Sequence, residues 1–276
     1  MAKPAGPTSH DVVDAVRAAL GVRRVGHLGT LDPFAAGLLV LVVGRATRLA
    51  TFAAGWRKTY EGVMRLGVTT ATDDATGTVL AEQSCDGIDR GRVEAAVAGF
   101  RGAYEQRPPA YSAVKVAGER AYRRARRGEA VQLPPRRVEI HELELTAVSL
   151  PQLLFRATVG GGTYLRSLAR DIGATLGCGA HLASLTRTAV GPLRLEDAVA
   201  PAEATAEQLR DPAVLVRDLP RRDLTPAERD AVVHGRPIAV ESAGEDPVAL
   251  FAGDEIVAVA WPVQGVLKPR VVVTAP

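Results

Sequence analysis

Residues 26–39 read GHLGTLDPFAAGLL and lead from a polar loop into the longest nearly unbroken apolar run of the chain, residues 38–43. Asp32 stands near the end of the loop. An aspartate followed by proline ahead of an apolar segment is typical of a helix N-cap with proline at the first helical position, and capping is the favoured interpretation of the dipeptide alone. His27 and two glycines lie directly upstream, however, and loops of this composition often carry functional sites. Asp32 is therefore a candidate for catalysis as well as for capping.

Regular elements are expected on both sides of this loop. Upstream, Thr8 or Ser9 can cap a helix, because apolar residues then recur every three or four positions as far as Leu20. Downstream, residues 60–67 alternate between two faces, which predicts a strand. The sequence TTATDDATG at residues 69–77 then indicates a turn.

The middle of the chain contains a predicted helix and, after it, a strongly basic segment. Residues 89–100 have helical apolar spacing and precede a proline-containing stretch. Between Lys115 and Arg127, KVAGERAYRRARR carries six basic residues against one acid, with Tyr122 among them. This composition indicates a phosphate-contacting element, and we expect a protruding, partly helical insertion. A merely solvated charged helix is the alternative.

Residues 153–176 have the pattern of a strand, a glycine turn and a helix. Thr163 is a natural N-cap for this helix, which would place Arg166 in the first turn, where the macrodipole disfavours a cation. Arg166 should then have an anionic partner, and a carboxylate such as Asp32 or an RNA phosphate would supply paired hydrogen bonds. A solvated arginine is the alternative. The glycine turn lacks the lysine and spacing of a phosphate-binding loop.

Three other candidates each have an ordinary structural explanation. Tyr60 on a strand is more often a packing residue than a catalytic one. His27 could be a surface loop residue, and Asp74 fits the chemistry of an Asx turn. None of the three is decisive alone.

Composition limits the remaining possibilities. With 276 residues and 47% apolar content the chain can bury a large core, and after residue 219 short β-like runs suggest a small all-β appendage. We expect a cytosolic protein, because no secretory signal or membrane span is evident. Cys85 and Cys178 lack metal-ligand or disulfide spacing, so free thiols are expected. A net charge of +3 says little about partners.

Taken together, these segments resemble the bacterial tRNA pseudouridine-55 synthase (TruB) family. KPAGPTSHDVV at residues 3–13 is similar to the family's KPxGxTSxxVV opening, and GHLGTLDPFAAGLL is similar to GHTGTLDPxAxGLL, whose catalytic aspartate is Asp32 here. KTYEGVMRLG matches the Lys-x-Tyr strand at Tyr60, and TTATDDATG matches the Thr/Asp-rich turn at Asp74. GTYLRSLARDIGATLGCGAHLASLTRT matches the arginine helix at Arg166, and PPAYSAVKVAGERAYRRARRG matches the RNA-gripping thumb.

The resemblance implies an enzyme that isomerises the uridine at position 55 in the T-loop of tRNA to pseudouridine, without metal or organic cofactor. Asp32 would act on the flipped uridine as a nucleophile or as a base at the sugar. Arg166 would pair with Asp32 to keep it ionised and aimed. Tyr60 would stack on the base and help to remove the proton from C5.

The resemblance also implies substrate contacts. His27 would fill the gap left in the RNA, Asp74 would orient His27, and Leu185 would pack beside the base. The thumb would contact phosphates of the T stem-loop. The implied substrate-binding residues are His27, Asp74, Tyr164, Leu185, Lys3, Arg123, Arg124 and Arg127.

The implied fold is the α+β pseudouridine synthase fold, with a mixed, mainly antiparallel sheet, flanking helices and a thumb insertion over about residues 104–133. The catalytic domain would span residues 1–218, and a small PUA-like β domain residues 219–276. We expect a cytoplasmic monomer that binds tRNA and needs neither a membrane nor an obligatory protein partner.

Two rival functions remain at this point. A guide-RNA-dependent relative, archaeal or eukaryotic, shares the aspartate loop but lacks the thumb insertion. A non-catalytic tRNA-binding folding chaperone would have no need for Asp32 and Tyr60. An aspartyl phosphatase is disfavoured, because DxDxT spacing is absent around Asp32.

Overall fold

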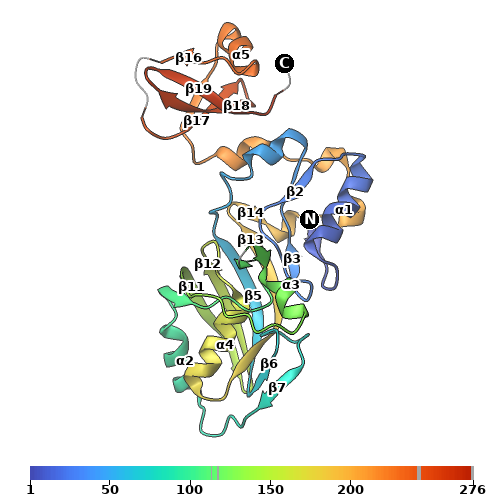
Figure 1. Cartoon of the computed structure of the whole chain (residues 1–276), viewed down its shortest axis with the longest axis vertical. Coiled ribbons are helices and arrows are strands. Elements are labelled where there is room, and N and C mark those ends of the chain that lie inside the picture. The colour runs from blue at the N-terminus through green and yellow to red at the C-terminus, as the bar shows by residue number, and fades with distance from the viewer. Residues whose placement is uncertain (113, 117, 241–243, 275–276) are drawn as a thin grey trace. The chain divides into compact units, whose positions relative to one another are not determined.

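The structure is a computed structural model that describes residues 1–112, 114–116, 118–240 and 244–274 (Figure 1). Contacts divide the chain into two units. The first comprises residues 1–9, 31–39 and 56–198, and the second comprises residues 10–30, 40–55 and 199–276. This division runs differently from the predicted boundary after residue 218, because two N-terminal segments group with the C-terminal residues. The domain boundary stays a prediction.

An eight-stranded mixed sheet forms the first unit. Its strands are β1 (Ala2–Lys3), β3 (Ala36–Leu38), β5 (Lys58–Leu66), β8 (Gly102–Gln106), β11 (Arg136–Ser149), β12 (Gln152–Val159), β13 (Ala180–Val190) and β14 (Leu193–Arg194). The order is β1-β3-β13-β5-β12-β11-β8, with β14 paired to β13. The β13–β3 pair is parallel and the other pairs are antiparallel, which confirms the predicted mixed, mainly antiparallel sheet.

Side chains alternate between buried and exposed positions along the central strands, which explains how these strands face the core. In β12, Leu153, Phe155 and Ala157 are buried while Leu154 is exposed, and in β5 Tyr60 and Met64 are buried. Two helices cover this sheet: α2 (Arg90–Ala98) contacts β11, and α4 (Leu165–Leu176) contacts β13 and β5 (Figure 1). The predicted strands and helices in these regions are confirmed.

The two predicted N-caps around the site differ from the structure. Asp32 caps no helix, because a turn at residues 33–34 leads into β3. Helix α4 has Tyr164 rather than Thr163 at its N-cap position, without a side-chain cap from that residue. The physical reason is tertiary: the Tyr164 N–H donates to the side chain of Gln106 on β8 at 2.8 Å, so a distant residue supplies the acceptor.

The first unit also contains two short hairpins. Strands β6 (Val68–Thr70) and β7 (Val79–Glu82) flank the Thr/Asp-rich turn. Strands β9 (Lys115–Val116) and β10 (Glu119–Arg120) precede α3 (Ala121–Arg126) within the predicted thumb. The expected partly helical insertion is therefore present.

The second unit contains α1 (Ser9–Leu20, beginning in the first unit), the pair β2 (Val25–His27) and β4 (Leu41–Val43), and a five-stranded sheet with order β15-β17-β18-β19-β16. These strands are β15 (Arg221–Asp223), β16 (Ile238–Ala239), β17 (Val248–Ala252), β18 (Glu255–Val263) and β19 (Val266–Val272). The predicted small C-terminal β domain is confirmed. The expectation that it is all β is wrong, because α5 (Pro226–Val233) packs on this sheet. Thr225 and Glu228 form a capping box with Pro226 at the first helical position, a signal that the sequence contains.

Short 3-10 segments connect these elements. They are η1 (Gly44–Leu49), η2 (Leu195–Asp197), η3 (Pro201–Glu203), η4 (Ala206–Gln208) and η5 (Pro212–Val216). Across the described ranges, none of the helices has the length and apolar character needed to cross a bilayer.

Candidate active site

The turn that carries Asp32 is anchored on both sides. Lys3 is buried on β1, and its ammonium donates to three main-chain carbonyls. The acceptors are Pro4 (2.9 Å), Pro33 (3.3 Å) and Ala35 (2.7 Å). On the other side, the Ser9 hydroxyl donates to the Leu31 carbonyl at 2.9 Å and accepts from the Leu31 N–H at 2.8 Å. This geometry favours a structural role for Lys3, whose predicted substrate contact stays a prediction.

Asp32 and Arg166 form a two-pronged ion pair. Arg166 Nε donates to Asp32 Oδ2 at 2.9 Å and Nη2 donates to Oδ1 at 3.2 Å. The Arg166 side chain is 5% exposed, whereas that of Asp32 is 35% exposed and remains open to a reactant. Arg166 is the second residue of α4, so the predicted cation in the first helical turn and its predicted carboxylate partner are both confirmed.

Further acceptors surround the buried guanidinium. Nη1 of Arg166 donates to the Thr72 carbonyl at 2.8 Å, and Nη2 donates to the Tyr111 carbonyl at 2.9 Å. These bonds fix the plane of the guanidinium, because its donors have a rigid geometry. The plane in turn determines where the Asp32 carboxylate lies.

Asp74 is a second carboxylate at the same arginine. Its Oδ2 lies 3.6 Å from Arg166 Nη1, and its side chain is 6% exposed. Asp74 Oδ1 accepts from the Thr72 hydroxyl at 2.8 Å and from the N–H and hydroxyl of Thr76 at 2.9 and 2.6 Å. The bond to the Thr76 N–H confirms the expected Asx turn. The sequence did not indicate the contact with Arg166, and the predicted action of Asp74 on His27 stays a prediction.

Tyr60 and Leu185 lie on neighbouring strands of the sheet. Both are 7% exposed, and in the β5–β13 register Leu185 pairs with Gly62 while Tyr60 pairs with Arg187. A Cβ on Gly62 would lie 2.5 Å from the Ser184 carbonyl oxygen, so the two strands approach closely there. Their predicted roles at the base stay predictions.

Arg187 is a residue that the sequence reasoning missed. Its side chain is fully buried, its guanidinium carbon lies 6.0 Å from the centre of the Tyr60 ring, and its Nε donates to the Leu38 carbonyl at 2.8 Å. Arg187 therefore links β5, which carries Tyr60, to β3, which follows the Asp32 turn. The available signal was a charged residue within the segment that forms β13, because arginine is almost never fully buried unless it is paired.

Tyr164 is half-buried beside the ion pair. Burial raises the pKa of its phenol, and the nearby Asp32 charge acts in the same direction, against Arg136 and Arg166. A neutral phenol is therefore favoured, and it can donate a hydrogen bond to a ligand. Its predicted substrate contact remains to be tested.

The predicted thumb arginines have different environments. Arg127 donates two hydrogen bonds to Glu119, at 2.7 and 2.8 Å, and one to Glu129. Arg124 also donates to Glu129, whereas Arg123 is exposed. Two of the three predicted phosphate contacts thus have acidic partners within the thumb itself. His27, the remaining predicted residue, lies on β2 in the second unit.

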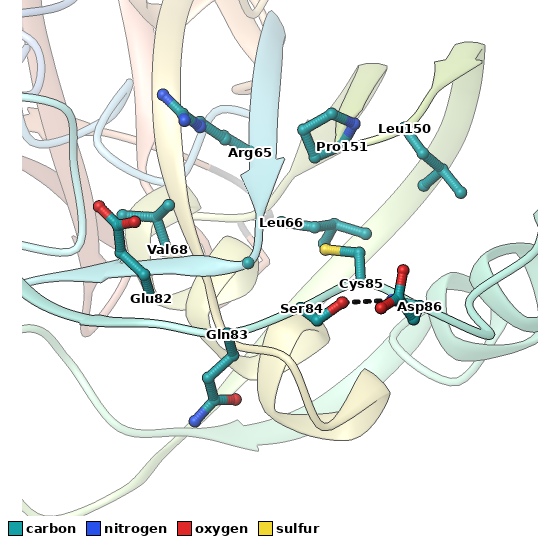
Figure 2. A pocket seen from close by; sticks show the side chains of 11 residues that line it. Arg65, Leu66, Val68, Glu82, Gln83, Ser84, Cys85, Asp86, Leu150 and Pro151 are labelled. Atoms are coloured by element: carbon teal, nitrogen blue, oxygen red, sulfur yellow. Dashed lines mark hydrogen bonds between the residues drawn. The ribbon is translucent and has the colours of Figure 1, made fainter.

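An open pocket in the same unit contains none of the predicted site residues (Figure 2). Arg65, Glu82, Cys85 and Pro151 are among its lining residues. Both cysteines are free, as expected, and burial together with the adjacent Cys178 thiol raises the pKa of Cys85, which makes it a poor nucleophile. Among the described residues, no three His, Cys, Asp or Glu side chains come together as a metal site requires.

Two family models and several bacterial proteins are similar to this chain over most of its length. Residues 17–165 match the N-terminal domain of the TruB family pseudouridylate synthases, and residues 166–229 match a tRNA pseudouridylate synthase B C-terminal domain. A protein from Thermobifida fusca (strain YX) named tRNA pseudouridine synthase B is 47% identical, over 98% of this chain and 96% of its own length. A protein of the same name from Synechococcus sp. (strain WH7803) is 43% identical, over 99% of this chain and 96% of its own length.

Solved structures share the fold at lower identity. An H/ACA RNP bound to a substrate RNA containing 2'-deoxyuridine contains a chain with a TM-score of 0.74 and 23% identity, covering 99% of this chain and 83% of that one. A Cbf5-Nop10-Gar1 complex contains a chain with a TM-score of 0.72 and 25% identity, covering 99% and 84%. These likenesses confirm the α+β fold, and the much higher identity to the bacterial relatives decides the family: this chain belongs to the TruB family of pseudouridylate synthases.

Proposed function

We propose that this protein is a stand-alone tRNA pseudouridine synthase that converts the uridine at position 55 of the T-loop to pseudouridine. The observation that carries the proposal is the Asp32–Arg166 pair, a partly exposed carboxylate held in two hydrogen bonds by a buried guanidinium. The relatives at 42–47% identity that carry the name tRNA pseudouridine synthase B supply the substrate class.

The chemistry requires the base to leave and return. The bond between C1′ of the ribose and N1 of uracil breaks, the base turns, and C5 forms a new bond to C1′. C5 then loses its proton and N1 gains one, so that the product is an isomer of the substrate. Asp32 either attacks C1′ and is displaced when C5 bonds there, or removes a proton from the sugar and returns it as C5 bonds to C1′. Both routes begin with the carboxylate in a fixed orientation. Arg166 provides that orientation, since its two donors to Asp32 define the plane of the carboxylate.

Tyr60 is proposed to stack on the flipped base and to assist loss of the C5 proton. Tyr60 is buried on β5, which lies between β12 and β13, and Leu185 lies on the neighbouring strand β13, opposite Gly62. A base removed from its stack needs an aromatic or apolar surface of this kind. Tyr164 and Leu185 complete the proposed lining.

The RNA would be held through its backbone. Arg123, Arg124 and Arg127 of the thumb are proposed to contact phosphates of the T stem-loop, which positions the RNA without reading its sequence. His27 is proposed to fill the space that the flipped nucleotide leaves.

We propose a cytoplasmic monomer without an obligatory protein partner.

The test is direct detection of pseudouridine in an unmodified tRNA transcript after incubation with the purified protein alone. Wild-type protein should modify position 55 without guide RNA. Asp32→Asn preserves the shape of the side chain and removes its charge, so it should eliminate conversion and leave tRNA affinity nearly unchanged. Single-turnover conversion by Asp32→Asn near the wild-type rate would refute the assignment, and modification only with added guide RNA would favour the RNA-guided alternative.

A further inference from the structure

The first turn of α4 is fastened by a segment that is distant in sequence. Gln106 ends β8 and is 1% exposed. Its Oε1 accepts from the Tyr164 N–H at 2.8 Å, and its Nε2 donates to the Tyr164 carbonyl at 3.1 Å and to the Tyr104 hydroxyl. One buried carboxamide therefore binds both main-chain groups of Tyr164, the N-cap residue of α4.

This arrangement replaces an ordinary helix cap. Tyr164 provides no side-chain cap, and the Thr163 hydroxyl is buried without a hydrogen-bond partner among the described residues. The first N–H groups of a helix have no partner within the helix, so an external acceptor is needed to stop the end from fraying. Gln106 meets this need at Tyr164, two residues before Arg166.

Residues that follow Gln106 extend the contact. The Arg107 carbonyl accepts from the Ser167 hydroxyl at 2.9 Å and from Arg170 Nη2 at 2.7 Å. The Tyr111 carbonyl accepts from Arg166 itself at 2.9 Å. Residues 106–111 thus bind the N-cap residue of α4 and three residues of the helix, and the same stretch lies at the start of the predicted thumb.

We propose that Gln106 is a positioning residue of the active site, which holds the start of α4 so that Arg166 meets Asp32, and that residues 106–111 couple the thumb to this ion pair. The inference rests on the proposed function. It follows from the short path between the groups, because the backbone position of Tyr164 determines that of Arg166 within half a helical turn. A displacement of about 1 Å at a catalytic group can lower a rate by roughly 10²-fold.

The test uses Gln106→Met, which keeps the length of the side chain and removes both bonds to Tyr164. At saturating tRNA its single-turnover rate should fall by roughly 10²-fold, while the dissociation constant for tRNA should change by less than about threefold. The double variant with Arg166→Lys should be no slower than Arg166→Lys alone, within about threefold, because both substitutions disturb one interaction.

Two further variants make the result decisive. Asp89→Ala removes the side-chain cap of α2 in the same unit and should leave the rate unchanged in the folded protein. Ser167→Ala removes only the bond to the Arg107 carbonyl and should slow the reaction by roughly threefold to tenfold, which tests the segment even where Gln106→Met does not fold.

The outcomes separate the two proposals. A wild-type protein that forms no pseudouridine in tRNA would refute the proposed function. An active wild-type protein with unchanged rates in folded Gln106→Met, or with unchanged rates in Ser167→Ala, would overturn the positioning role alone. Multiplicative effects in the double variant would also overturn it, because Gln106 would then act independently of Arg166.

Discussion

Replacing Arg166 with lysine separates the geometry of the ion pair from its charge. Arg166 makes four hydrogen bonds, two to Asp32 and one each to the carbonyls of Thr72 and Tyr111, and it lies 3.6 Å from the Asp74 carboxylate. A lysine offers one nitrogen on a flexible stem. That nitrogen cannot occupy the positions of three guanidinium nitrogens, so at least two of the four bonds should be lost.

The magnitude follows from these bonds. A hydrogen bond to a charged group contributes about 1.5–3 kcal/mol, so two lost bonds correspond to about 3–6 kcal/mol. Because about 1.4 kcal/mol is a tenfold change, the single-turnover rate of Arg166→Lys should fall by roughly 10²–10⁴-fold. Arg166→Ala should be similarly slow, since it also leaves the buried Asp74 carboxylate without its cation.

The assay is release of tritium from tRNA that carries [5-³H]uridine, measured at saturating enzyme. Arg170→Lys is the matched control, because Arg170 lies one turn later on the same helix and binds Asp73, Asp171 and the Arg107 carbonyl rather than Asp32. We expect the control to lose less than about tenfold in rate. An Arg166→Lys enzyme within tenfold of wild type would show that Arg166 supplies only positive charge.

Four other predictions concern Tyr60, Lys3, the thumb arginines and Asp73. Tyr60→Phe should keep tRNA affinity and lower product formation by roughly 10²-fold, and an unchanged yield would reduce Tyr60 to a packing residue. Lys3→Met should lower the free energy of unfolding by about 2–4 kcal/mol in urea titrations without changing the salt dependence of tRNA binding, whereas a shallower dependence would support the predicted substrate contact. A variant with four thumb arginines changed to glutamine should lower the slope of log affinity against log salt by roughly 1.5–3, whereas a solvated helix would leave it unchanged. The four are Arg123, Arg124, Arg126 and Arg127. Burial raises the pKa of Asp73 despite the nearby arginines, so its ionisation costs stability as the pH rises above about 3.9. Asp73→Asn suits the positive φ of this residue and should therefore raise Tm at pH 7 relative to wild type, with the gain vanishing near pH 3, whereas an equal gain at both values would contradict the electrostatic cause.

The sequence predicted those features that depend on neighbours along the chain. The alternation of apolar residues predicted β5 and β12, and apolar residues at every third or fourth position predicted α2 and α4. The position of Arg166 in a first helical turn predicted an anionic partner, because the helix macrodipole makes that position unfavourable for an unpaired cation. The Asx turn at Asp74 was likewise a local property.

Features that depend on tertiary contacts could not be predicted in this way. The capping signals at Thr163 and Asp32 were wrong, because Gln106 occupies the Tyr164 N–H and because Pro33 begins a turn toward β3. Residue spacing alone contains no information about a carboxamide 58 residues away. The contact of Asp74 with Arg166 escaped prediction for the same reason.

The Asp32–Arg166 pair is a product of the whole first unit rather than of one motif. The macrodipole disfavours Arg166 by about 0.3–1 kcal/mol, and a single charge-assisted bond of about 1.5–3 kcal/mol offsets this. Its partners Asp32, Thr72 and Tyr111 lie 134, 94 and 55 residues away in sequence. The carboxylate can therefore be oriented only after the aspartate turn, the Thr/Asp-rich turn and the start of the thumb have all met α4. A disturbance in any of these three segments should reach catalysis through the same guanidinium.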